Sequence, residues 1–449
     1  MVKTKKALII SYYFPPQLTV LSRRIGKFSK YFNEYGWQPI ILTVKNPDMP
    51  ETDISFYNDI KDKVKIYKSR DIFSFSFFKR NLFVNYERLS DSDRKKTNNS
   101  FSLFDLIAKK IIRLLLLDDK NKIGWILLSI IKGIEIIKKE NIDVIYSSPL
   151  PYSSNLVGYI LSRITKVPWV AEGGGIWLLD KKSDIYSIFT SKIFNKLIFY
   201  LSISKSQKFV VVTPQIGEHL KKAYKNFAHK IYTIICGYDE NDFRGAAKLV
   251  RKDDDFIVTY AGTIYSNEQL EPFCEAVRNA IDENRQFASK LKIYFYSNLA
   301  YSSYRAQAIV KYNLQKIIIL LPYVAFSYYI EAIKNSDLLL FSQPPSEHVN
   351  LRLGTKIFDY LRTGKPILAL LPKNGGASSI IEDINTVRIV DIFDVDKIKA
   401  AVLAFYSENK LNKPKIEPNF DKIKKYNAAE SVEKLCCLFN QIIEEHHAK

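Results

Sequence analysis

The sequence predicts an α/β protein with two doubly wound parallel sheets, one in each half of the chain. Apolar runs of buried-strand length alternate with amphipathic segments of helical length along both halves. A polar, charged stretch at residues 240–255 separates the halves and predicts a linker. The 449 residues suffice for two or three full domains. We expect a first domain over residues 1–240, a second over 241–425, and a final helix over 426–449 that packs back on the first domain.

The beginning of the chain shows the repeating unit most clearly. Residues 7–13 are a continuous apolar run, as in a buried parallel strand. An amphipathic helix is expected over residues 22–35, ended by Gly36, and a second strand over 39–44. The intervening loop lacks the Gly-x-Gly-x-x-Gly pattern, so a nicotinamide or flavin dinucleotide site is not supported.

The later elements continue the alternation of strand and helix. Strands are expected at residues 142–148, 169–171, 208–213, 230–235, 256–260, 291–296, 317–320, 337–341, 366–371 and 387–390, and helices at 268–285, 328–335 and 428–444. Ligands of such sheets bind beyond the carboxyl ends of the strands, so we expect the two domains to face a cleft.

An irregular insert is expected at about residues 71–125. Its residues 104–117 are apolar with Lys and Arg inserted, a composition that suits either an anionic membrane interface or a core helix with one basic face. No apolar stretch reaches the roughly 20 residues needed to span a bilayer, and the N-terminus lacks a signal-peptide pattern. We expect a cytoplasmic protein, with a peripheral position on the inner face of the plasma membrane as a further hypothesis.

The net charge of +20 indicates nucleic acid, an anionic membrane surface or polyphosphate ligands as partners. No RNA-recognition, helix-turn-helix or zinc-finger pattern is present, so no specific nucleic-acid partner is expected. The four cysteines have no metal-binding spacing and fit a reducing compartment. We expect neither a metal ion nor a cofactor.

The clearest chemical signal is the helix that begins after Gly354 and Thr355 and ends at Gly364. Small residues at its start leave first-turn N–H groups uncovered, which favours an anion, and Lys356 adds a positive charge. Asp359, one turn later, is placed to accept hydrogen bonds from vicinal hydroxyls. An ordinary i,i+3 surface pair between Lys356 and Asp359 explains this window equally well.

Two loops of the first half also follow strands. Three glycines come after residues 169–171, and Gly174 among them permits close backbone approach to a ligand. Glu172 is the only carboxylate at that rim and is the candidate catalytic residue. After the first strand, Arg23 or Arg24 could meet a phosphate, although a solvated arginine pair is the favoured interpretation of either residue taken alone.

The pattern resembles the GT-B glycosyltransferases, and among them those of glycosyltransferase family 4. The resemblance covers nearly the whole chain, and no one of its motifs is diagnostic alone. They are Ser-Tyr-Tyr-Phe-Pro-Pro at 11–16, Gly-Trp at 36–37, Asp-Val-Ile at 143–145, Pro-Trp-Val-Ala at 168–171, Val-Thr-Pro at 212–214, Gly-Tyr-Asp at 237–239, Tyr-Ala-Gly-Thr at 260–263, and residues 354–369.

The resemblance implies a nucleotide-diphosphate sugar as co-substrate, bound by the second domain. Gly354, Thr355 and Lys356 would hold the diphosphate, and Asp359 would bond the ribose hydroxyls. Gly262, Thr263 and Tyr265 would flank the diphosphate or the sugar. The first domain would bind a glycan or lipid-linked acceptor near Pro16, Gln17, Arg23, Arg24 and Gly174. Transfer would retain the anomeric configuration without a metal ion.

The sequence departs from the family pattern on the acceptor side. The first loop has Gln17-Leu18 where Gly-Gly is usual, and residues 172–177 replace a run of Asp-Phe-Arg-Asp-Pro-Trp type. Asp359 stands for a Glu, Leu351 stands where the paired Glu is expected, and Glu347 and His348 are out of register. Surface-polysaccharide synthesis is the leading function. A nucleotide-sugar epimerase, a degenerate partner that binds without transfer, and a basic membrane-surface or nucleic-acid binder remain alternatives.

Overall fold

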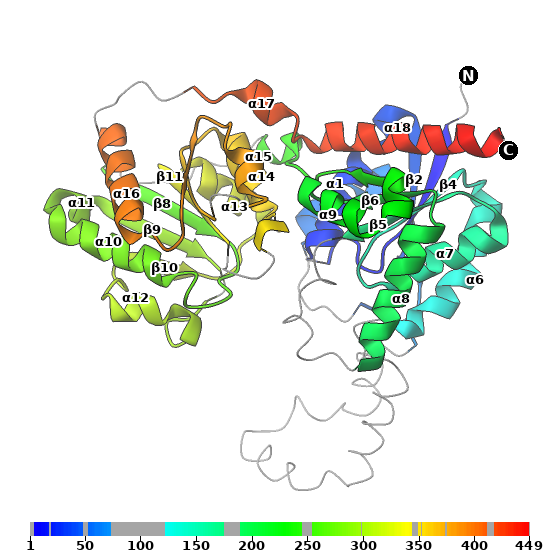
Figure 1. Ribbon diagram of the computed structural model, residues 1–449, viewed down its shortest axis with the longest axis horizontal. Coiled ribbons are helices and arrows are strands. Elements are labelled where there is room, and N and C mark those ends of the chain that lie inside the picture. The colour runs from blue at the N-terminus through cyan, green and yellow to red at the C-terminus, as the bar shows by residue number, and fades with distance from the viewer. Residues whose placement is uncertain are drawn as a thin grey trace, which may run out of the picture. The chain divides into compact units, whose positions relative to one another are not determined.

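The computed structural model describes residues 4–17, 19–47, 53–72, 122–174, 189–244, 254–297, 299–343, 349–351, 353–372, 375–410 and 417–448. The chain divides into two compact units (Figure 1). Unit 1 comprises Met1–Val212, Ile216–Ile234 and Val432–Lys449, and unit 2 comprises Thr213–Gln215 and Ile235–Ser431. The predicted insert at 71–125 lies almost wholly outside the described residues.

Unit 1 contains a parallel sheet whose strands lie in the order β3-β2-β1-β4-β5-β6-β7. Its strands are β1 (Lys5–Ile10), β2 (Trp37–Val44), β3 (Lys65–Ser69), β4 (Val144–Ser147), β5 (Trp169–Gly174), β6 (Lys208–Val211) and β7 (Ile231–Thr233). The strand order reverses between β1 and β4, which is where doubly wound sheets bind ligands.

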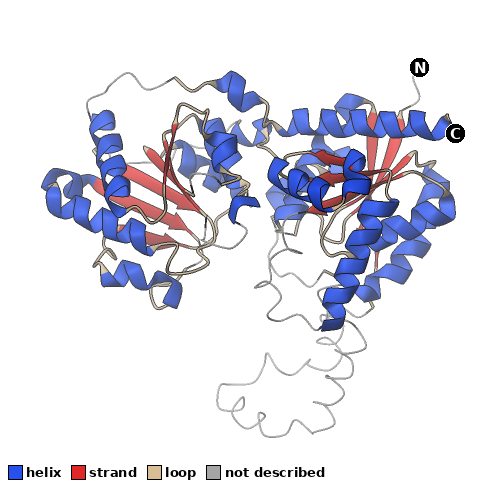
Figure 2. Ribbon diagram, in the orientation of Figure 1, coloured by secondary structure: helices blue, strands red, loops and turns tan. Residues whose placement is uncertain are grey.

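The helices of unit 1 connect these strands. They are α1 (Val20–Tyr31), α2 (Ile54–Asn58), α6 (Ile123–Glu140), α7 (Ser153–Thr165), α8 (Phe189–Lys205) and α9 (Pro214–Ala223), with short 3-10 turns between some of them. Helix α7 packs against both α6 and α8, so these three form one layer. Blue helices cover the red strands of the sheet in Figure 2.

Helix α1 is shorter than predicted because its last turn tightens. The Thr19 hydroxyl caps the start by accepting a hydrogen bond from the Ser22 amide, at 2.9 Å. The segment Phe32–Tyr35 is a 3-10 helix, and Gly36 ends it with a φ of 77°. A left-handed residue there favours glycine, as the sequence indicated.

Unit 2 contains a second parallel sheet with the order β10-β9-β8-β11-β12-β13. Its strands are β8 (Phe256–Ala261), β9 (Leu291–Tyr296), β10 (Ile318–Leu321), β11 (Leu338–Ser342), β12 (Ile367–Leu370) and β13 (Val387–Val390). The order reverses between β8 and β11, which places the ligand-binding position of this unit beyond the ends of those two strands.

The helices of unit 2 cover both faces of its sheet. They are α10 (Glu271–Glu283), α11 (Arg285–Lys290), α12 (Gln307–Lys311), α13 (Phe326–Lys334), α14 (Lys356–Thr363), α15 (Ser378–Ile381), α16 (Val395–Lys410) and α17 (Phe420–Lys424). One core cluster joins the sheet to α10 and α16, and a second joins it to α13 and α14. The predicted class of two doubly wound α/β sheets is therefore confirmed.

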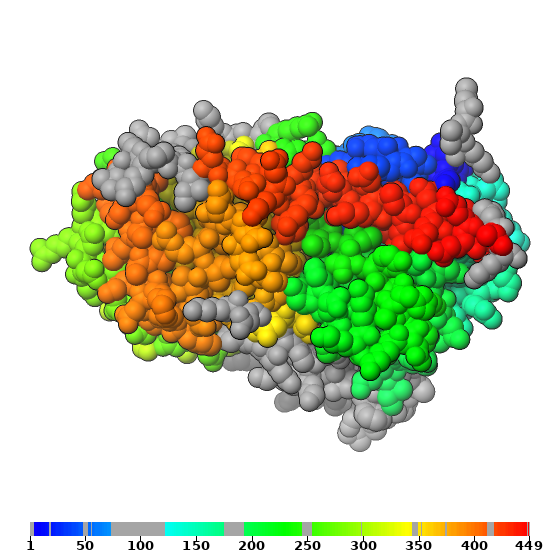
Figure 3. All heavy atoms as spheres, turned by 45° about the horizontal axis from the view of Figure 1, so that its top comes forward, coloured from blue at the N-terminus to red at the C-terminus, as the bar shows by residue number. Residues whose placement is uncertain are grey.

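The final helix, α18 (Ala428–His447), packs by most of its length within unit 1. Phe439 stacks on Phe32, with ring centroids 6.1 Å apart, and contacts the edge of Trp37. The Lys5 ammonium donates to the Asn440 side chain at 2.7 Å. In Figure 3 this red helix lies between the blue N-terminal residues and a green segment of the same unit.

Some elements differ from the sequence expectations. The predicted strand over 7–13 ends at Ile10, and the predicted helix over 268–285 begins only at Glu271. Strand β3 and helix α8 were not anticipated. No helix within the described part of the chain is long and apolar enough to cross a membrane.

Candidate functional site

The loop after β8 has a fixed shape at the carboxyl end of the unit 2 sheet. The Gly262 amide donates to the Tyr296 carbonyl at 3.1 Å, and the Tyr260 hydroxyl donates to the Thr263 carbonyl, also at 3.1 Å. The Thr263 and Tyr323 hydroxyls lie 2.9 Å apart. Tyr265 is exposed, so a ligand can reach its ring. This loop thus presents the predicted residues Gly262, Thr263 and Tyr265 together.

Gln269 holds the same loop from behind. Its side-chain oxygen accepts from the Tyr265 amide at 3.1 Å, and its side-chain nitrogen donates to the Tyr260 hydroxyl and the Ser342 carbonyl, each at 3.4 Å. Burial raises the pKa of Tyr260 well above its usual range, so its hydroxyl stays protonated. Ser342 ends β11, and Gln269 therefore joins the two strands at which the sheet order reverses.

Helix α14 starts as the sequence predicted. Thr355 is its N-cap residue and makes no side-chain capping bond, while the Gly354 carbonyl accepts from the Ile357 amide at 3.2 Å. A Cβ on Gly354 would stand 3.0 Å from the Phe341 ring, so a larger residue there requires the ring to shift. Gly364 ends the helix with a φ of 67°. The start of α14 therefore suits an anion.

Tyr360 connects the helix to the loop, and sequence reasoning missed it. The Ala261 amide donates to its hydroxyl at 2.9 Å, and both residues are buried. Ala261 immediately precedes Gly262, so this bond fixes α14 against the first predicted donor residue. Burial raises the pKa of Tyr360 well above its usual range. A tyrosine beside Asp359 in a helix with a buried face was the only available signal.

Asp359 lies in a small polar cluster with Tyr329 and Lys356. The Tyr329 hydroxyl donates to the Asp359 carboxylate at 3.3 Å, and the Lys356 ammonium stands 5.1 Å from the centre of the Tyr329 ring. Asp359 is only 6% exposed. The exposed surface pair considered for Lys356 and Asp359 is therefore contradicted, because the carboxylate is buried.

Glu172 lies in the interior of unit 1 rather than at an open rim. One carboxylate oxygen lies 3.0 Å from the Arg24 Nε, the other accepts from the Tyr146 hydroxyl, and the side chain is 0% exposed. Burial and the neighbouring Glu172 raise the pKa of Tyr146 well above its usual range. Arg24 also donates to the Ile234 carbonyl at 2.8 Å. Each oxygen of the candidate catalytic carboxylate thus has a partner.

The remaining predicted acceptor residues of unit 1 are held by local contacts. Arg23 lies 3.6 Å from the Asp53 carboxylate, and the Asp53 amide donates to the Pro16 carbonyl at 2.7 Å. The Gln17 side chain accepts from the Phe14 amide at 3.0 Å. Gly174 has a φ of 67°, and a Cβ there would meet Pro149 at 2.8 Å.

Three ranges singled out in the sequence lie outside the described residues, namely 175–177, 347–348 and most of the insert. Among the residues that are described, no three His, Cys, Asp or Glu side chains form a metal-binding group.

Comparison with solved structures decides the fold. A glycosyltransferase from Rickettsia africae ESF-5 matches with a TM-score of 0.62 at 15% identity, over 98% of this chain and 99% of that chain. The chain has the GT-B fold. S. aureus TarM, as a variant in complex with fondaparinux, alpha-GlcNAc-glycerol and UDP, matches with a TM-score of 0.58 at 12% identity, over 97% and 100% of the two chains.

Anabaena HepE in complex with UDP matches this GT-B chain with a TM-score of 0.55 at 12% identity, over 98% of each chain. At such identities the likeness shows the fold alone. No protein-family model matches the sequence, and no curated protein sequence matches it. The resemblance to GT-B glycosyltransferases is thus confirmed for the fold, and membership of family 4 stays a prediction.

Proposed function

We propose that the protein is a glycosyltransferase that moves a sugar from a nucleotide-diphosphate sugar to a glycan or lipid-linked glycan, in surface-polysaccharide synthesis. The observation that carries the proposal is the hydrogen bond from Ala261 to Tyr360. It holds the middle of α14 against Ala261, the residue before Gly262, at the point where the order of the unit 2 sheet reverses. GT-B proteins with UDP bound, TarM and HepE among them, share the fold.

The donor would be held by groups of two kinds. The uncapped start of α14 and the Lys356 ammonium would bind the diphosphate, while Asp359 would accept hydrogen bonds from the ribose hydroxyls. Tyr329 would keep the Asp359 carboxylate oriented, since its hydroxyl donates to it. Thr263 and Tyr265 would flank the diphosphate or the sugar.

Catalysis would rest on stabilising the departing nucleoside diphosphate. Negative charge grows on that group as the glycosidic bond breaks, and the α14 start with Lys356 would attract it most at that moment. Retention of configuration and independence of metal ions are proposed from the resemblance alone. Pro16, Gln17, Arg23, Arg24 and Gly174 are proposed to shape or hold the acceptor side.

Titration calorimetry against UDP- and GDP-sugars tests the donor site. We expect Lys356→Ala to weaken binding at least tenfold, because a charge-assisted hydrogen bond contributes about 1.5–3 kcal/mol. Lys316→Ala, an exposed lysine of the same unit, is the matched control and should bind as the parent does. If Asp359→Ala binds every nucleotide-sugar as the parent does, the proposed site is refuted.

A degenerate partner that binds nucleotide-sugar without transferring it is the second candidate. The complete burial of Glu172 between Arg24 and Tyr146 favours it, since a base or nucleophile must come within hydrogen-bond reach of the substrate. Release of free sugar from the donor without added acceptor would argue against this candidate. Donor binding with neither hydrolysis nor transfer to any acceptor tested would favour it.

We propose a cytoplasmic location, with contact at the inner face of the plasma membrane. The net charge of +20 and the free cysteines among the described residues support this proposal. A basic membrane-surface protein that uses the fold only as a scaffold would bind anionic vesicles but no nucleotide-sugar. The calorimetric panel therefore separates that alternative from an enzyme.

A further inference from the structure

Two serines at the ends of one loop of unit 1 have buried hydroxyls that the fold does not use. Ser148 directly follows β4, and Ser153 is the first residue of α7. Both residues are 0% exposed, and within the described part of the chain neither Oγ has a hydrogen-bond partner. Because buried hydroxyls are nearly always hydrogen-bonded, two such groups at one loop indicate a partner supplied from outside the chain.

This loop lies where the strand order of unit 1 reverses. The Ser148 amide donates to the carbonyl of Ile10, the last residue of β1, at 2.9 Å. The Tyr12 amide donates to the Ser154 Oγ at 3.3 Å, which joins the loop after β1 to the first turn of α7. Doubly wound sheets bind ligands at such a reversal, here between β1 and β4. These bonds fix the loop without using the Ser148 or Ser153 hydroxyl.

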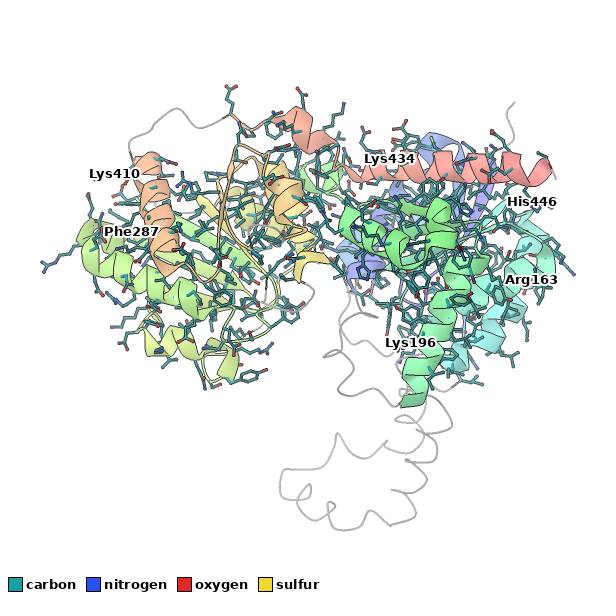
Figure 4. The ribbon with its side chains drawn as sticks, in the orientation of Figure 1. Arg163, Lys196, Phe287, Lys410, Lys434 and His446 are labelled. Carbon is teal, nitrogen blue, oxygen red and sulfur yellow. The ribbon has the colours of Figure 1, made fainter. Side chains whose placement is uncertain are left out.

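The start of α7 (Ser153–Thr165) suits an anion. Its N-cap residue, Tyr152, makes no side-chain capping bond, and its first turn contains no acidic residue. The opposite end of the helix dipole is complemented, because Arg163 lies in the last turn (Figure 4). The aligned peptide groups of 13 residues therefore present partial positive charge at Ser153, next to the two unused hydroxyls.

No carboxylate belongs to the loop or to α7. From Val144 to Ala171 the sequence contains neither Asp nor Glu. Glu172 comes next, and its carboxylate lies 3.0 Å from the Arg24 Nε. Asp71, which is buried beside the loop after β1, accepts from the Tyr12 hydroxyl at 2.8 Å. An anion at the start of α7 thus finds hydrogen-bond donors in residues 148–165 and no carboxylate among them.

We propose that the start of α7, with the Ser148 and Ser153 hydroxyls, binds a phosphate group carried by the acceptor. Helix N-termini and serine hydroxyls are groups with which proteins hold phosphate oxygens. Leu150 in the same loop is half-buried, so the loop reaches the surface there. The assignment to the acceptor rests on the proposed function, which places the acceptor in unit 1. The substrate class is then a glycan that carries a phosphate ester.

Titration calorimetry of the full chain with glucose 1-phosphate, glucose, glucuronate and inorganic phosphate tests the proposal. Because the start of α14 is also proposed to take phosphate, Lys356→Ala serves as the parent in these titrations. We expect glucose 1-phosphate to bind and glucose not to bind. Adding Ser153→Ala should weaken that binding at least tenfold, as expected for the loss of a hydrogen bond to a charged group. Adding Ser148→Ala should weaken it in the same direction.

Ser202→Ala is the matched control. Ser202 is a buried serine of unit 1, and its hydroxyl donates to the Ile198 carbonyl at 2.7 Å. The control should lose stability in urea unfolding and keep the affinity of the parent for glucose 1-phosphate. Ser148→Ala and Ser153→Ala should unfold at the urea concentration of the parent, because they break no hydrogen bond within the fold.

The proposal is overturned if glucose 1-phosphate does not bind, or if inorganic phosphate or glucuronate binds as tightly as glucose 1-phosphate. It is also overturned if Ser153→Ala and Ser202→Ala weaken binding equally. Equal losses of stability in Ser148→Ala, Ser153→Ala and Ser202→Ala would overturn it too, because all three hydroxyls would then serve the fold. A chain that binds glucose 1-phosphate through α7 but no nucleotide-sugar would refute the proposed function and leave the phosphate site. The reverse result would refute the phosphate site alone.

Discussion

Replacing Tyr360 by Phe removes one buried hydroxyl that supports the proposed donor site from behind. That hydroxyl accepts from the Ala261 amide at 2.9 Å, and Ala261 and Tyr360 are only 4% and 1% exposed. The amide is left without this acceptor in a place that water does not reach. An unsatisfied buried donor costs about 1–3 kcal/mol, and we expect the free energy of unfolding to fall by that amount.

The same change should also weaken nucleotide-sugar binding, because α14 is no longer fixed against the Gly262 loop. We expect a loss of three- to tenfold in affinity by calorimetry, about 0.6–1.4 kcal/mol. Tyr426→Phe is the matched control. Tyr426 is a buried tyrosine of the same unit, and its hydroxyl donates to the Ile380 carbonyl at 2.9 Å.

The control should lose stability in urea unfolding but keep its affinity for the donor. If Tyr360→Phe and Tyr426→Phe lose stability equally and both bind the donor as the parent does, the bond has no positioning role. If Tyr360→Phe unfolds at the same urea concentration as the parent, the structural argument itself is refuted.

Three further changes test other parts of the structure. Glu172→Gln should lower the free energy of unfolding by about 3–5 kcal/mol, since it leaves the buried Arg24 without its carboxylate; lost transfer at unchanged stability would instead favour a catalytic role. The hydrogen bond from Lys65 is the main cause that lowers the pKa of Glu140 from 4.5 to about 2. The contribution of ionised Glu140 to the free energy of unfolding is therefore present above pH 5 and is lost as the pH falls toward 2. A plot of the urea midpoint against pH should show that loss of stability, and the Glu140→Gln variant should lack this pH dependence. Gly364→Ala should cost about 1–2 kcal/mol in urea unfolding because φ is 67° there, and an unchanged midpoint would contradict the assigned cap.

The elements that the sequence predicted well are those whose signal is local. Strands β9 (Leu291–Tyr296) and β13 (Val387–Val390) have the predicted bounds, because continuous apolar runs bounded by polar residues specify buried strands. Gly364 was recognised because a glycine after a helical pattern is a local feature. Strand β3 was missed since it lies at the edge of the sheet and is partly exposed. Helix α8 was missed because its own apolar residues are spread over several sides of the helix and do not form one clear stripe.

The residues of the candidate site also fall into two groups, those that are close in sequence and those that only the folded chain brings together. Gly354, Lys356 and Asp359 are neighbours in sequence, so the start of one helix brings them together, and the sequence predicted that helix; their binding of a donor stays a prediction. On the other side, Glu172 is defined by Arg24 on α1 and Tyr146 on β4, which only the folded sheet brings within contact. A lone carboxylate after a strand gives no sign of a buried arginine that comes from the first helix. Burial therefore makes Glu172 half of an ion pair and not a free acid. Under the proposed function, transfer would depend on the donor side or on a group that Glu172 and Arg24 position.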